Sequence, residues 1–136
     1  MIGIGSEFRG DDAAGLEVAR RLRRVTSATC IDGSLDMINL WDGWSDVALV
    51  DATRSGSAPG TIQRFDGKKT DFPSSAFVST HAIGTGEAIR LAREMGLLPD
   101  KLTVYGIEAG SFAIGAPLTP SVAGAVDVLV EELDNA

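Results

Sequence analysis

The stretch Gly3-Ile-Gly-Ser-Glu-Phe-Arg-Gly-Asp-Asp-Ala-Ala-Gly15 decides how the chain is organised. The apolar residues 1–4 predict a short strand, and the first two glycines permit a sharp turn where side chains would clash. Asp11 and Asp12 then stand where a helix is expected to begin. These acids are therefore expected at the carboxyl end of a first strand, the usual ligand side of an open α/β sheet.

Length and composition limit the classes of protein to which the chain can belong. With 136 residues, the chain is expected to form a single domain, residues 1–136, with a real core. A net charge of −7 argues against a nucleic-acid partner. No apolar run approaches the roughly 20 residues of a membrane span, so no membrane partner is expected. The single cysteine, Cys30, cannot form an internal disulfide; we expect it to be buried and inert, and the protein to be cytoplasmic.

Strand-like and helix-like segments alternate along the rest of the chain. Apolar runs predict further strands over 28–32, 46–52, 61–65 and 102–107. Helical periodicity and capping signals predict helices over 12–25, 35–41, 81–96 and from 119 onward. The connection 53–60 is too short for a parallel crossover, so the fourth strand should run antiparallel to the third at a sheet edge. The pattern predicts an α/β fold with a mixed sheet.

Two further residues that could carry chemistry are expected at the same end of the sheet as Asp12. Asp51 directly follows the apolar run 47–50 and precedes a loop rich in Gly, Ser and Pro, which favours a functional carboxylate over a turn former. His81 is the only histidine and stands at the start of the predicted third helix. Residues 66–80 are long enough to return the chain to the ligand end. We therefore expect Asp12, Asp51 and His81 to converge.

Each of these residues also has a purely structural interpretation. Asp11 or Asp12 could cap the first helix. A lone histidine at a helix start is more often a hydrogen-bonded surface residue than a ligand. For Glu108, which follows the fifth strand, a structural and a functional role are equally favoured. The predicted convergence of two carboxylates and one imidazole is what favours a site.

The predicted donors indicate a class of chemistry. Carboxylate and imidazole groups suit a divalent transition ion such as Ni²⁺ or Zn²⁺, which could polarise a carbonyl and make bound water nucleophilic. A dinucleotide site is disfavoured, because Phe8 occupies the position of the third glycine of that fingerprint. The sequence contains no P-loop, no H-E-x-x-H and no G-x-S-x-G elbow. A nucleophilic Ser6 or Ser79 beside His81 stays an open alternative.

The motifs as a set resemble those of the hydrogenase maturation proteases, endopeptidases that process the large subunit of nickel–iron hydrogenases. Residues 3–15 are similar to the family's opening motif, G-[IV]-G-N…D-[DE]-G-x-G. The other matching segments are Val47-Ala-Leu-Val-Asp51-Ala for its third-strand acid, Ser79-Thr-His81 for its histidine, and the fainter Asp32-Gly-Ser34. The resemblance covers nearly the whole chain, in order. Ser6 and Ala13 stand where the family has Asn and Gly, and neither change removes a predicted ligand.

The resemblance implies a fold and an activity. The fold would be a three-layer α/β/α arrangement of the phosphorylase/hydrolase-like type, with a five-stranded mixed sheet of four parallel strands and one antiparallel strand. The activity would be removal of a C-terminal extension from a nickel–iron hydrogenase large-subunit precursor after nickel insertion. Asp12, Asp51 and His81 would be the catalytic residues and would ligate nickel supplied by the substrate. Some enzymes of this kind are classed as aspartic-type.

Two other functions stay open from the sequence. One is a non-catalytic module that binds the precursor and senses its nickel loading. The other is a hydrolase of the same fold that acts on a small substrate.

Overall fold

The centre of the fold is a mixed sheet with strand order β2-β1-β3-β5-β4. The computed structural model describes residues 1–22, 28–31, 36–72, 77 and 84–135. The strands are β1 (Ile2–Ile4), β2 (Thr29–Ile31), β3 (Asp46–Thr53), β4 (Ile62–Asp66) and β5 (Lys101–Glu108). Strand β4 runs antiparallel to β5 at one edge, and the other neighbours pair in parallel. The predicted α/β class and the mixed sheet are confirmed.

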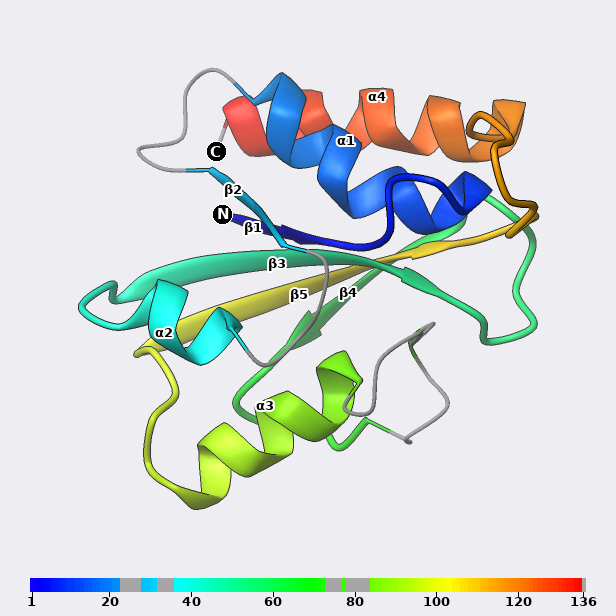
Figure 1. The fold of residues 1–136 in the computed structure, drawn as a ribbon. Coiled ribbons are helices and arrows are strands. Elements are labelled where there is room, and N and C mark those ends of the chain that lie inside the picture. Colours follow the sequence, from blue (N-terminus) through cyan, green and yellow to red (C-terminus); the bar gives the residue numbers. More distant parts are fainter. Residues whose placement is uncertain (23–27, 32–35, 73–76, 78–83, 136) are drawn as a thin grey trace.

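Helices cover both faces of this sheet, as Figure 1 shows. Two of them, α1 (Ala14–Arg21) and α4 (Pro120–Asp134), lie on one face. The other two, α2 (Met37–Trp41) and α3 (Thr85–Glu94), lie on the opposite face. Among the described residues, no helix has both the length and the apolar character needed to cross a membrane.

The beginning of the first helix differs from its prediction. A helix was expected over 12–25, but Gly10–Ala13 form a 3-10 turn and α1 begins only at Ala14. This turn is attached to the loop after β5, because the Asp11 amide donates to the carbonyl of Ser111 at 2.8 Å. The third helix is also shorter than expected, since α3 begins at Thr85 rather than at residue 81.

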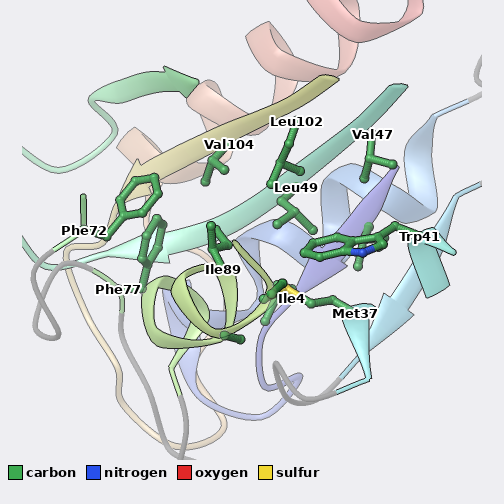
Figure 2. Close-up of a cluster of buried hydrophobic side chains, with 13 residues drawn as sticks. Ile4, Met37, Trp41, Val47, Leu49, Phe72, Phe77, Ile89, Leu102 and Val104 are labelled. Carbon is green, nitrogen blue, oxygen red and sulfur yellow. The ribbon is translucent and has the colours of Figure 1, made fainter. Parts of the chain in front are cut away.

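Two hydrophobic clusters join the layers. Successive residues of β3 face opposite sides, so Leu49 belongs to the cluster beneath α2 and α3, and Val50 to the cluster beneath α1 and α4. Both residues are fully buried. Figure 2 shows the first cluster, with Ile89 of α3 and Trp41 of α2 facing Leu49 and Val104 of the sheet. The uninterrupted apolar run of β3 is thus explained by burial on both faces.

Helix α1 approaches the sheet very closely. A Cβ at Gly15 would lie 2.3 Å from the carbonyl oxygen of Val50 and 2.6 Å from that of Ile4. Only glycine allows the helix backbone to come this near to both strands. Because β1 and β3 are also paired in parallel, the turn between β1 and α1 lies beside the carboxyl end of β3.

Candidate functional site at the carboxyl end of the sheet

Asp51 is a buried carboxylate near the end of β3. The strand ends at Thr53, one residue beyond the predicted range 46–52, and the Asp51 side chain is only 1% exposed. One oxygen, Oδ2, accepts a hydrogen bond from Thr85 Oγ1 at 2.6 Å. The other, Oδ1, accepts one from the Ala52 amide at 2.8 Å. Asp51 is therefore held between β3 and the first residue of α3.

The environment of Asp51 makes its ionised form costly. Burial raises the pKa of Asp51 well above its ordinary value of 3.8, against the lowering effect of the Thr85 hydrogen bond. The negative charge of Asp12 raises this pKa further, and the amide of Ala52 lowers it. A second negative charge thus acts on a carboxylate that is already desolvated.

Asp12 comes from the other side of this edge. It lies in the 3-10 turn after β1 and is 3% exposed, and its amide donates to the Arg9 carbonyl at 3.2 Å. Its negative charge acts on Asp51, and the two residues belong to the turn after β1 and to β3, which are neighbouring strands paired in parallel. They approach from segments 39 positions apart in the sequence (51 − 12 = 39).

The third predicted residue, His81, lies outside the described residues. Within the ranges that the structure describes, no group of three His, Cys, Asp or Glu side chains is arranged to hold a metal ion. Those ranges contain both aspartates but not the histidine. The convergence of all three residues therefore stays a prediction.

The carboxylate pair has the chemistry needed to face a cation. An ionised carboxylate offers about four lone-pair positions, and among the described residues each oxygen of Asp51 accepts one hydrogen bond. Lone pairs therefore remain for a ligand. A cation placed between Asp12 and Asp51 would offset the repulsion that raises the pKa of Asp51. Oxygen donors with one imidazole suit a divalent transition ion.

Asp11, next to Asp12, has a structural role that differs from the expected helix cap. Its carboxylate is fully buried and accepts hydrogen bonds from the amides of Gly110 (2.7 Å), Ser111 (2.9 Å) and Thr119 (2.7 Å). The Thr119 hydroxyl also donates to it, at 2.8 Å. Thr119 occupies the predicted N-cap position before Pro120, but its hydroxyl is engaged by Asp11 and makes no capping bond. Asp11 therefore fastens the β5–α4 loop to the turn that carries Asp12.

Glu108, at the end of β5, also has a structural role. Its buried carboxylate accepts bonds from the Thr53 hydroxyl at 3.0 Å and from both the amide (3.0 Å) and the hydroxyl (2.6 Å) of Ser55. These bonds hold the loop that leaves β3. Of the two interpretations that the sequence left open, the contacts favour the structural one.

Sequence reasoning missed Thr85 as a residue of the site. It is 1% exposed and donates its hydroxyl to Asp51 from the N-terminus of α3. The available signal was a threonine at a helix start, which ordinarily indicates a cap. The partner is 34 residues away, so only the tertiary structure identifies the contact.

Comparison with known proteins agrees with this architecture. The family model HycI, hydrogenase maturation protease, matches residues 16–136, a range that includes Asp51 and His81 but not Asp12. The hydrogenase expression/formation protein HupD of Rhodobacter capsulatus is 25% identical over 141 residues, which cover 97% of this chain and 67% of HupD.

Solved structures show the same fold. The hydrogenase maturating endopeptidase HybD from E. coli superimposes with a TM-score of 0.75 at 22% identity, covering 97% of this chain and 86% of HybD. The [NiFe] hydrogenase maturation protease HycI from Thermococcus kodakarensis KOD1 gives a TM-score of 0.75 at 24% identity, covering 98% and 88%. The chain therefore belongs to the hydrogenase maturation proteases, a family of endopeptidases.

Proposed function

We propose that this protein removes the C-terminal extension of a nickel–iron hydrogenase large-subunit precursor after nickel has been inserted. The family supports processing of a hydrogenase large subunit. The observation that carries the finer proposal is the pair of buried carboxylates, Asp12 and Asp51, close enough for the charge of one to shift the pKa of the other. Two carboxylates of this kind are suitable ligands for a divalent ion, and nickel in the precursor would be that ion.

In this proposal, the nickel ion is part of the substrate. Asp12 and Asp51 would ligate it from the ends of β1 and β3, and His81 would be the third ligand. Nickel bound this way would act as a Lewis acid on the scissile carbonyl. The chain's own contribution is to hold the two carboxylates in place: Thr85 and the Ala52 amide orient Asp51, and Asp11 fastens the turn of Asp12.

Cleavage would thereby depend on nickel loading. A precursor without nickel would bring no ion to the two carboxylates, so the scissile peptide would not be held there. We place this processing in the cytoplasm, the compartment that a single cysteine favours.

The test is mass spectrometry of the precursor after incubation with the protein. The wild-type protein should remove a C-terminal fragment from nickel-loaded precursor and leave nickel-free precursor intact. Asp51→Ala should abolish the mass loss, and Asp100→Ala, an exposed aspartate far from the pair in sequence, should not. Full processing by Asp51→Ala would overturn the assignment of this residue.

The same assay separates the two other functions. Nickel-dependent binding of the precursor without loss of mass would identify a checkpoint module. Hydrolysis of small esters or peptides with no action on the precursor would identify a small-substrate hydrolase.

A further inference from the structure

Two large hydrophobic side chains stand out on the surface beside the acid pair. Among the described residues, Ile114 is the most exposed large hydrophobic at 83%, and Phe8 follows at 70%. Phe8 lies in the turn between β1 and α1, and Ile114 in the loop between β5 and α4. Such side chains cost free energy in water and are typical of surfaces that bind a partner.

The two loops that carry them are joined to each other. The Gly115 amide donates to the Phe8 carbonyl at 2.8 Å. Gly10 has a φ of +58°, and a Cβ there would lie 2.8 Å from the Ser111 carbonyl oxygen. Together with the four bonds to the Asp11 carboxylate, these contacts hold the loops in one arrangement. Binding to a surface ordered in advance loses little conformational entropy.

The turn that carries Phe8 also carries Asp12 of the candidate site. Phe8 is four residues before Asp12, and the turn between them is closed by the bond from the Asp12 amide to the Arg9 carbonyl. One of the exposed hydrophobic residues and one carboxylate of the pair are thus held by the same short turn. The pair itself is almost fully buried, so substrate contacts that hold the chain must lie outside it.

Two arginines, Arg9 and Arg54, lie next to these hydrophobic residues in a chain that is acidic as a whole. The chain carries a net charge of −7. Beside the hydrophobic residues, however, the Arg54 guanidinium lies over the Phe112 ring, 4.4 Å from its centroid. Within the described part of the chain, neither Arg9 nor Arg54 forms an ion pair, and Arg9 Nε is buried without a hydrogen-bond partner. Apolar and cationic groups together complement a segment that carries apolar and acidic side chains.

We propose that the surface formed by Phe8, Arg54, Phe112 and Ile114, here called the docking rim, binds a segment of the hydrogenase large-subunit precursor next to its scissile bond. The inference rests on the proposed function for the identity of the partner. It goes beyond that function, because recognition at the docking rim would not depend on nickel. The segment would carry apolar residues against Phe8 and Ile114 and a carboxylate near Arg54.

The test compares two double variants. Phe8→Ser/Ile114→Ser removes the docking rim's apolar contacts. As a matched control, Met95→Ser/Val128→Ser removes two other exposed hydrophobic side chains (59% and 54%), one just after α3 and one on α4. Two quantities are measured: KM and kcat for nickel-loaded precursor, and Kd for nickel-free precursor. Thermal unfolding of all proteins verifies that they fold.

The docking-rim variant should raise both KM and Kd by about tenfold or more, as loss of interface anchors does, with kcat changed less than twofold. The control should match the wild type. Arg54→Gln should raise Kd by a smaller factor that shrinks at high ionic strength, because its effect is electrostatic.

The outcomes distinguish this inference from the proposed function. Unchanged KM and Kd in the docking-rim variant, or no binding of nickel-free precursor by the wild type, would overturn docking even if cleavage occurs. If binding of the precursor depends on the docking rim but nickel-loaded precursor is not cleaved, the docking inference stands and the proposed function is overturned. A dimer of this chain that the variant abolishes, with Kd for precursor unchanged, would assign the surface to self-association instead and overturn the inference.

Discussion

Asp11 and Asp51 are buried to the same degree, at 0% and 1% exposure, but they are used differently. The Asp11 carboxylate accepts four hydrogen bonds that join two loops about 100 residues apart in sequence. The Asp51 carboxylate accepts two from the described residues, and both its burial and the charge of Asp12 raise its pKa. One acid is saturated with donors, whereas the other retains acceptor capacity and faces a like charge.

This difference shows what separates a structural acid from a functional one. Burial alone does not, because both side chains are inaccessible. A carboxylate that accepts four hydrogen bonds, as Asp11 does, stabilises the folded state. A carboxylate with acceptor capacity left over, beside another negative charge, costs free energy in the folded protein, which makes Asp51 a candidate functional residue.

The largest expected effect is the loss of activity when Asp51 is neutralised. In Asp51→Asn, processing of nickel-loaded precursor should fall by about a thousandfold, since a group at the reacting atoms is lost. The free energy of unfolding should stay the same or rise, because the variant no longer buries an ionised group. Precursor cleavage rates and urea denaturation measure the two effects, and a large loss of stability would contradict the comparison.

For Asp11→Asn, the main expected effect is a loss of stability. The side-chain NH₂ group of asparagine is a donor and cannot accept the backbone N–H groups of residues 110, 111 and 119. Some of these buried donors therefore lose their acceptor. The free energy of unfolding should fall by about 2–4 kcal/mol. Urea denaturation monitored by circular dichroism gives this value. A variant as stable as the wild type would show that the hydrogen bonds of Asp11 do not stabilise the attachment of the β5–α4 loop.

A smaller effect should follow from Thr85→Val, which removes one donor to Asp51 and nearly preserves the volume. The loss of this bond should cost about 1 kcal/mol of stability and slow processing, because the Asp51 side chain is less firmly oriented. Thr85→Ser retains the hydroxyl and serves as the control. If both variants process precursor equally fast, the hydroxyl does not orient Asp51 for the reaction.

The smallest effect concerns an exposed ion pair far from the site. Arg64 Nε donates to Glu132 Oε2 at 2.9 Å, and the two guanidinium–carboxylate contacts join β4 to α4. The hydrogen bond from Arg64 lowers the pKa of Glu132 below its ordinary value of 4.5. The stability it contributes is therefore present above pH 4.5 and is lost as the pH falls through the lowered pKa.

Because both side chains are largely in solvent, Glu132→Gln should lower the free energy of unfolding by only about 0.5 kcal/mol at pH 7. The difference from the wild type should vanish at pH 2. Urea denaturation at the two pH values measures it, with the exposed Glu131→Gln as a neighbouring comparison on the same helix. A difference that persists at pH 2 would show that the effect is not electrostatic.

Much of the fold could be predicted because it depends on local patterns. The apolar run of β3 indicated a strand buried on both faces, and the short 53–60 connection indicated the antiparallel edge strand β4. The 3-10 turn that precedes α1 could not be predicted, since a contact that holds it, from the Asp11 amide to the Ser111 carbonyl, joins residues 100 positions apart. The convergence of Asp12, Asp51 and His81 was predicted from their places at strand ends and at a helix start, and the charge of Asp12 does act on Asp51. The placement of His81 beside them, outside the described residues, is still a prediction.

The sequence by itself determined the order of strands and helices along the chain. It also determined which acidic residues stand at the ends of strands. These properties follow from the periods of helix and strand and from the direction of parallel strands. Only the tertiary structure decided which acid is saturated and which is not. The donors to Asp11, Glu108 and Asp51 come from 34 to about 100 residues away, apart from one neighbouring amide, so no local pattern could reveal them.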